Sequence, residues 1–249
     1  MRLTSRLLTE AGFVHGFSTR RGGVSAPPFD ALNLGGSVGD DPAAVERNLE
    51  LLAADAGIDR GAFRAVRQVH GDRVLVAGEG PHDPDAEADA VLAAAPGLAA
   101  AIKTADCVPI LIADEATGLA AAVHAGWRGT VAEIAVRAVE ALQARGAAPS
   151  RLVAAVGPAI GRCCYEVSPD LAARFASRHG AAAVEGRRID LATANRLLLL
   201  EAGLAADRID VLDRCTSCEP ALFFSHRRDA GRTGRHLSFV AARKPRSLS

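Results

Sequence analysis

Short apolar runs bounded by turn-forming residues dominate the middle of the chain. They lie at 88–92, 98–102, 108–113 and 119–124. Runs of this kind are typical of strands buried in a sheet. Further strands are expected at 13–19, 65–70, 73–77, 151–157, 209–212, 222–224 and 237–241, and we expect the second and third of these to flank a turn at Gly71 and Asp72.

Four segments show helical spacing with recognisable ends. Asp41 and Pro42 supply an N-cap and a first-turn proline, apolar positions recur through 45–56, and Gly57 is a stop signal. Other helices are expected at 130–145, 169–178 and 191–202. The pattern predicts an α/β (α+β) fold, with one domain spanning 1–249 and a mixed central β-sheet flanked by helices.

Composition narrows the class of protein. Hydrophobic residues make up 49% of the chain, enough for a sizeable core, and 29 basic residues balance 29 acidic ones. A net charge of zero argues against a nucleic-acid partner. The most apolar stretch, 91–102, is interrupted at Pro96 and stops at Lys103, so no membrane span is predicted. Five cysteines and no signal peptide indicate free thiols in the cytoplasm, and we expect a monomer.

Three side chains with metal-binding chemistry stand at the ends of predicted strands. They are His70, Cys107 and His124. One thiolate and two imidazoles leave a tetrahedral position of Zn²⁺ open, as in catalytic zinc sites. Their spacing matches no short zinc motif, so two other interpretations stay open. The three residues can be structural, or Cys107 can be a metal-free nucleophile with His124 as base and Asp106 nearby.

Four motifs carry a resemblance to a known family. They are QVHGDRV at 68–74, TADCVPIL at 104–111, VHAGWRGT at 123–130 and VGPAIG at 156–161. Together they resemble the YfiH-like family, also labelled multicopper polyphenol oxidoreductase or laccase-domain protein. The resemblance extends from FSTRRGGVS at 17–25 to TGRHLS at 233–238, nearly the whole chain.

This resemblance implies a fold, a metal site and an activity. The implied fold is a single α/β domain distantly similar to toxin deamidases, and the implied ligands are His70, Cys107 and His124. The implied reaction is zinc-dependent phosphorolysis of purine nucleosides (adenosine, inosine and methylthioadenosine), accompanied by adenosine deamination. An editing role on peptidoglycan precursors is also attached to bacterial members.

The laccase label can be examined by counting histidines. The chain has 7. A multicopper oxidase needs a blue-copper centre and a trinuclear cluster, whose combined histidine requirement exceeds that number. A single Cys-His-His site can still take up copper, because Cu²⁺ outcompetes Zn²⁺ at most nitrogen and sulfur sites. Copper in this protein would therefore not establish oxidase chemistry.

Substrate and phosphate are expected to contact polar residues near the motifs. The candidates are Arg20, Asn33, Gln68, Arg128 and Arg227, of which Arg128 is best placed because it follows His124 by one helical turn. Arg21 and Arg228 are further candidates, because they also lie in turns beside the motifs. The family usually has Tyr where this chain has His226, which puts nucleoside stacking at that position in doubt.

The remaining cysteines are interpreted as structural. Cys163 and Cys164 are adjacent, which places them poorly for joint chelation, and Cys215 and Cys218 form a CxxC without a second pair. Three functions compete at this stage. They are a zinc-dependent purine nucleoside phosphorylase with deaminase activity, a metal-free Cys-His hydrolase or deamidase, and a non-catalytic binding or cell-wall-precursor editing factor.

Overall fold

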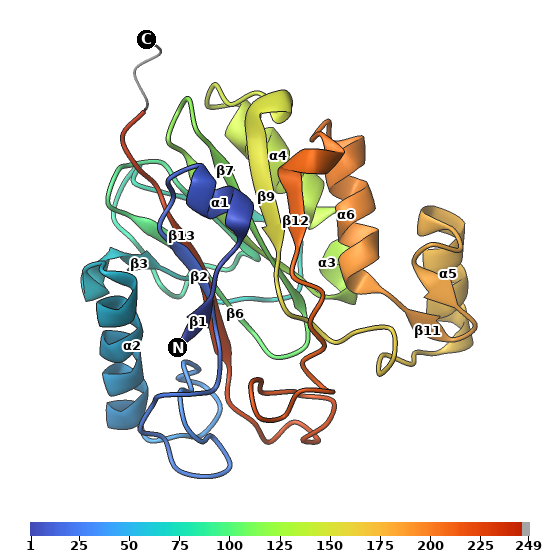
Figure 1. The fold of residues 1–249 in the computed structure, drawn as a ribbon, viewed down its shortest axis with the longest axis horizontal. Coiled ribbons are helices and arrows are strands. Elements are labelled where there is room, and N and C mark those ends of the chain that lie inside the picture. Colours follow the sequence, from blue (N-terminus) through green and yellow to red (C-terminus); the bar gives the residue numbers. More distant parts are fainter. Residues whose placement is uncertain (246–249) are drawn as a thin grey trace.

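The computed structural model describes residues 1–245 and shows two β-sheets stacked between helices (Figure 1). The larger sheet has six strands in the order β12-β9-β7-β8-β5-β4. Strands β8 and β7 pair antiparallel at its centre, whereas the outer pairs β12–β9 and β4–β5 are parallel. Its strands are β4 (Val74–Ala77), β5 (Ala90–Ala93), β7 (Val108–Asp114), β8 (Ala120–Ala125), β9 (Leu152–Val156) and β12 (Ile209–Val211).

The second sheet has five strands in the order β1-β2-β13-β6-β3. Its central strand β13 comes from the end of the chain and pairs antiparallel with both β2 and β6. The strands are β1 (Arg2–Leu3), β2 (His15–Ser18), β3 (Phe63–Arg64), β6 (Ala99–Thr104) and β13 (His236–Ala241). A separate two-stranded ribbon consists of β10 (Val184–Glu185) and β11 (Arg188–Ile189).

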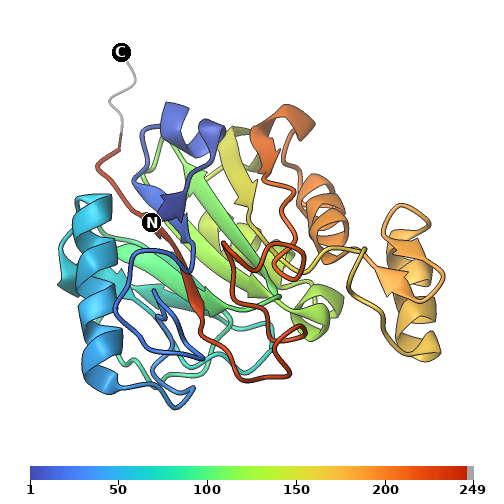
Figure 2. The same ribbon diagram turned by 60° about the horizontal axis from the view of Figure 1, so that its bottom comes forward.

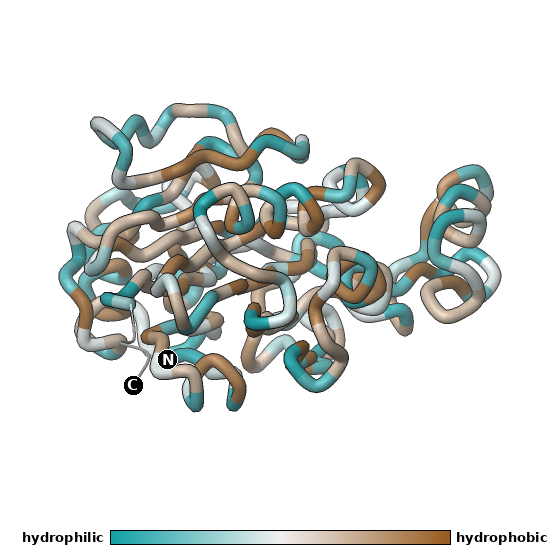
Figure 3. The backbone as a smooth tube through the Cα atoms, turned by 90° about the horizontal axis from the view of Figure 1, so that it is seen from above, coloured by the Kyte–Doolittle hydropathy of each residue, from teal (hydrophilic) through white to brown (hydrophobic). Residues whose placement is uncertain are grey.

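Helices cover the outer faces of both sheets. Helix α2 lies along the five-stranded sheet, and α3, α4 and α6 lie beside the six-stranded sheet (Figures 1 and 2). Helix α5 and the small ribbon stand apart from this body (Figures 1 and 3). The helices are α1 (Arg6–Glu10), α2 (Pro42–Ala56), α3 (Trp127–Val131), α4 (Ile134–Gln143), α5 (Pro169–His179) and α6 (Leu191–Glu201).

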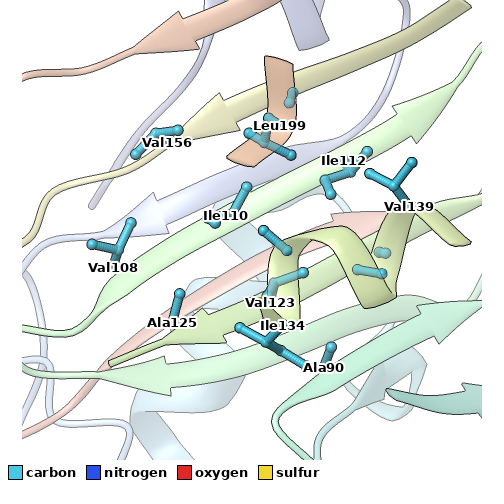
Figure 4. Packing of buried hydrophobic residues seen from close by; sticks show 14 of the residues in the cluster. Ala90, Val108, Ile110, Ile112, Val123, Ala125, Ile134, Val139, Val156 and Leu199 are labelled. Atoms are coloured by element: carbon cyan, nitrogen blue, oxygen red, sulfur yellow. The ribbon is translucent and has the colours of Figure 1, made fainter. Parts of the chain in front are cut away.

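Alternation along the strands builds a separate core on each face. Ile110 and Ile112 of β7 pack with Val123 of β8 against α4 and α6 (Figure 4). The intervening Leu111 joins the cluster between the two sheets, where alanines predominate and allow close packing. His124 has the parity of the inter-sheet face, and this places its side chain toward the second sheet.

The structure confirms the mixed α/β class and differs in several elements. There are two sheets where one was expected. Residues 65–70 are mostly coil, and β4 pairs in parallel with β5, so the expected strand pair around Gly71 is absent from the described chain. The helix expected at 130–145 is divided because Glu133 adopts a left-handed conformation with φ 60°. Residues 222–224 are not a strand.

No helix within residues 1–245 is both long and apolar enough to cross a bilayer.

Candidate active site

The structure brings His70, Cys107 and His124 together. One potential ligand atom from each lies within 4.8 Å of the other two. Cys107 directly precedes β7, His124 is in β8, and the two strands pair so that His124 stands opposite Pro109. His70 comes from the loop before β4, and its ring meets that of His124 edge-on with centroids 4.8 Å apart.

A buried carboxylate orients two of these residues. Asp89 is fully buried at the start of β5, and its Oδ1 lies 2.8 Å from Nδ1 of His124. The same carboxylate accepts the backbone N–H groups of His70 at 2.9 Å and Gly71 at 2.6 Å. Asp89 therefore fixes the His70 loop and holds the His124 tautomer that leaves Nε2 free to bind a metal.

Local backbone geometry packs the trio tightly. His70 has φ 61°, and Asp106, immediately before Cys107, has φ 89°. Non-glycine residues in this left-handed region are held there by their surroundings. Gly126 faces the cluster, and a Cβ at this position would approach the Cys107 sulfur to 3.0 Å and Cδ2 of His70 to 3.2 Å. The HAGWRG motif thus needs glycine here because there is no room for a side chain.

The thiol and the imidazole polarise each other. Burial alone would raise the pKa of Cys107, but the charge and hydrogen bond of His124, with a hydrogen bond from His70, lower it to about 6. Burial opposes protonation of His124, while the Cys107 thiolate and Asp89 raise its pKa to about 9. The sulfur is therefore readily available as a thiolate, the form that binds metals and attacks electrophiles.

This donor set fits a zinc ion. A thiolate and two imidazoles are ordinary Zn²⁺ ligands, and a second-layer carboxylate on His124 is the usual partner of a metal-bound histidine. Three protein ligands match a catalytic centre that keeps one position open. Copper fits the same donors, so the residues indicate metal binding without fixing the ion.

The trio lines a cavity of about 730 Å³. Four cationic side chains line it without an ion-pair partner among residues 1–245, namely Lys103, Arg128, Arg227 and Arg235. Burial lowers the pKa of Lys103 and of Arg235, which shows that both charges lie away from bulk water. Unpaired cations around a cavity favour an anionic ligand.

Aromatic groups stand beside these cations. The Arg128 guanidinium lies 4.4 Å from the Trp127 ring centroid, and that of Arg227 lies 5.0 Å from the Tyr165 ring. Burial raises the pKa of Tyr165 to about 12, so its hydroxyl stays protonated. His226 also lines the cavity. The cavity therefore offers flat surfaces for a ring system next to charges for an anion.

The other predicted contacts divide into two groups. Arg128, Arg227 and Gln68 line the cavity. The Gln68 amide is occupied by the backbone of Lys103, donating to its oxygen at 2.8 Å and accepting its N–H at 2.7 Å. Gln68 therefore positions Lys103.

Arg20 and Asn33 have structural partners instead. The Arg20 guanidinium donates to the Asp30 and Pro220 oxygens at 2.7 and 3.1 Å, and it does not line the cavity. Asn33 is fully buried, and its Oδ1 accepts the N–H of Arg235 at 2.8 Å. Neither residue lines the cavity, and both side chains use their polar groups to hold loops together.

Sequence reasoning missed Tyr165, Asp89, Lys103 and Arg235 of this site. Asp89 is a charged residue in the otherwise apolar run 88–92, and a charge in such a run can indicate a buried side chain that has a polar partner. Lys103 ends an apolar run in a chain with only one other lysine. Arg235 lies in the TGRHLS motif, but its place at the cavity depends on the pairing of β13 with β6, a contact between distant segments that no local pattern predicts.

The fold and cavity define an α/β protein with a Cys-His-His cluster surrounded by cationic side chains. Residues 14–243 match the family model described as multi-copper polyphenol oxidoreductase laccase, and the chain belongs to this family. Among residues 1–245, the groups of His, Cys, Asp and Glu that could hold a metal include a single one with histidine. Residues 1–245 therefore do not contain the several histidine-rich copper centres that the family's label suggests.

Relatives and solved structures agree with this assignment. The chain is 44% identical to a Mycobacterium tuberculosis protein over 90% of this chain and 89% of the relative, and 46% identical to a Deinococcus radiodurans protein over 91% and 88%. Both relatives are named purine nucleoside phosphorylase. The crystal structure of Bacillus licheniformis YfiH matches with a TM-score of 0.87 and 35% identity, covering 93% of each chain. YlmD from Geobacillus stearothermophilus matches with 0.85 and 39%, covering 94% of this chain and 93% of its own.

Proposed function

We propose that this chain is a purine nucleoside phosphorylase whose centre holds Zn²⁺ at His70, Cys107 and His124. The observation that carries the proposal is the gathering of unpaired cations and aromatic faces around the trio in one cavity. The relatives' names support the reaction class. The expected substrates are adenosine, inosine and methylthioadenosine, with inorganic phosphate as the second substrate.

Phosphate is the ligand that the cations suit. In phosphorolysis, a phosphate oxygen attacks the ribose carbon C1′, the bond from C1′ to the base breaks, and the base leaves with a proton. Arg128 and Arg227 are exposed and can form two parallel hydrogen bonds to phosphate oxygens. Lys103 and Arg235 are more deeply placed, where reduced solvation strengthens their attraction for the anion.

The base is expected to lie against the aromatic rings. Trp127 and Tyr165 both line the cavity, and each already carries a guanidinium on one face. A purine beside them would lie next to the guanidiniums that are proposed to hold the phosphate. When bound at the trio, Zn²⁺ supplies Lewis acidity toward the departing base and a polarised water. Asp89 keeps the His124 ring in place, and Gly126 leaves the space above the sulfur open.

Adenosine deamination is proposed as a second activity of the same cavity. It needs water in place of phosphate as the nucleophile, directed at C6 of the purine. Three protein donors rather than four leave room for such a water.

A metal-free thiol mechanism is the alternative that one observation favours. Cys107, His124 and Asp89 form a hydrogen-bonded series like that of cysteine hydrolases. The two mechanisms differ in what inactivates them. Removing metal with a chelator should abolish zinc chemistry and leave thiol chemistry intact.

The decisive experiment incubates purified protein with adenosine, with and without phosphate. Phosphorolysis predicts adenine and ribose 1-phosphate only when phosphate is present, and slow inosine formation without it. The same assay is run on a chelator-treated sample and on a sample reconstituted with Zn²⁺, so that the two differ only in metal content. Base release that ignores phosphate would contradict phosphorolysis, and full activity after verified metal removal would transfer the function to the Cys107 thiol.

A further inference from the structure

Four cysteines outside the cavity form a second cluster. Cys163 and Cys164 lie in the loop after β9, and Cys215 and Cys218 lie in the loop after β12. All four sulfur atoms are within 4.8 Å of one another. The sulfur of Cys218 is 3.5 Å from that of Cys163 and 3.4 Å from that of Cys164. The CxxC therefore does have a second pair, contrary to the sequence-based interpretation.

The local turn explains why adjacent cysteines can act together. The N–H groups of Cys164 and Tyr165 both bond to the oxygen of Gly161, at 2.9 and 3.1 Å. This tight turn brings the Cys163 and Cys164 side chains to the same neighbour, Cys218. Ordinary extended backbone would have directed them to opposite sides.

Sulfur spacing identifies what the cluster can hold. Disulfide sulfurs are about 2.05 Å apart, much closer than these. Four thiolates at about 2.3 Å from one Zn²⁺ have sulfur–sulfur separations of about 3.8 Å in a tetrahedron. The observed spacing is close to that value. It fits one ion and leaves little space for an iron–sulfur cluster, whose bridging sulfides would push the cysteines apart.

The backbone around the cluster suits thiolates. The N–H of Gly161 donates to the Cys215 sulfur at 3.2 Å, and the N–H of Cys218 donates to the same sulfur. Such donors offset the negative charge of thiolate ligands. A Cβ at Gly161 would come within 3.2 Å of the Cys163 sulfur, so glycine provides the close approach that this arrangement requires.

We infer that Cys163, Cys164, Cys215 and Cys218 form a structural site for a single thiophilic divalent ion, with Zn²⁺ as its occupant. A four-cysteine set is a closed coordination sphere, so this ion takes no part in catalysis. It would join two loops that both reach the active-site cavity. Tyr165 directly follows one pair, and Thr216, beside the other, hydrogen-bonds Asp106 at 2.6 Å.

Metal content distinguishes this site from the catalytic trio. Protein prepared under reducing conditions, equilibrated with Zn²⁺ and desalted should hold two zinc equivalents per chain. The double variant Cys163→Ser/Cys218→Ser should lose the ion of the four-cysteine cluster and hold one zinc equivalent. Cys107→Ser should lose the ion of the trio and also hold one zinc equivalent. Both mutated residues of the double variant are exposed, so the fold should be retained, which circular dichroism can verify. Ser217→Ala is the control and should keep two.

A spectroscopic measurement makes the test independent of stoichiometry. Cobalt-substituted Cys107→Ser protein should show the intense visible bands of a tetrahedral thiolate-bound Co²⁺, and the further Cys163→Ser/Cys218→Ser changes should remove them. Zinc content that the Cys163→Ser/Cys218→Ser changes leave unaltered, native disulfides among these cysteines, or acid-labile sulfide would overturn the proposal. None of these outcomes depends on whether the cavity performs phosphorolysis.

Discussion

Replacing Asp89 by Asn tests how the candidate centre is held together. The substitution keeps the size of the side chain and removes its charge. If the new amide oxygen stays on His124, the amide NH₂ faces the N–H groups of Gly71 and Val69, which now bond to Oδ2 at 2.6 and 3.2 Å. Losing an acceptor costs about 1–3 kcal/mol for each buried donor. Both donors are only partly buried, so we expect the free energy of unfolding to fall by about 2 kcal/mol in total.

Metal affinity should change more specifically than stability. A carboxylate behind a ligand histidine typically contributes about 10–100-fold to metal affinity. We therefore expect Asp89→Asn to weaken Zn²⁺ binding at the trio by that factor. The assay is competition with a chromophoric chelator, performed in the Cys163→Ser/Cys218→Ser background so that only this site is measured.

A second buried carboxylate provides the control. Asp114 is also fully buried, accepts hydrogen bonds from Thr117 and Arg151, and lies at the far end of β7 from Cys107. Asp114→Asn should lower stability without changing zinc affinity. Equal affinities for wild type and Asp89→Asn would refute the orienting role of Asp89. An equal loss of zinc affinity in Asp114→Asn would show that the loss follows from lower overall stability and not from the contact between Asp89 and His124.

Three further predictions concern the trio, the cations and a buried histidine. Cys107→Ser should lose the trio's metal and the phosphorolytic activity together, because a serine hydroxyl is a poor zinc ligand; retained metal by elemental analysis would contradict this. Arg128→Ala should keep the metal but lower kcat/KM for phosphate by about 10–100-fold, whereas Arg137→Ala, on the exposed side of α4, should not, as steady-state kinetics with varied phosphate can decide. Burial lowers the pKa of His236 to about 3 from 6.5, so it is neutral when folded and protonated when unfolded in acid. Its contribution to stability is complete above pH 6.5 and is lost as the pH falls toward 3, by about 1.4 kcal/mol per pH unit. His236→Gln, which can still accept the Phe224 N–H, should flatten this dependence in denaturant titrations, and an unchanged slope would count against the assignment.

Local signals predicted the elements that local interactions determine. Asp41 caps α2 with Pro42 in its first turn, and Gly57 ends the helix in a left-handed conformation, as the sequence indicated. Short apolar runs correctly marked β5 to β9, because buried strands need no alternation. The helix expected at 130–145 is interrupted at Glu133. The side chain of Glu133 pairs with Arg178 of α5, a contact that no local pattern contains.

In the candidate site, too, local sequence predicted some features, whereas contacts between distant segments determined others. His70, Cys107 and His124 could be singled out because each ends or precedes an apolar run and carries ligand chemistry. Their metal-binding and catalytic roles stay predictions. Sequence reasoning could not find the approach of Cys163 to Cys218, because the turn at Gly161 and the parallel bridge between Ala159 and Cys215 bring the two loops together.

The position of β13 has a consequence for biosynthesis. This strand fills the centre of the five-stranded sheet, between β2 and β6, yet it is translated after all the other strands of residues 1–245. Until residue 241 has left the ribosome, β2 and β6 each present an unpaired edge, and such edges are prone to aggregate. Closure across more than two hundred residues of sequence also raises contact order and slows folding. The nascent chain should therefore expose these two strand edges until β13 has emerged and paired with both.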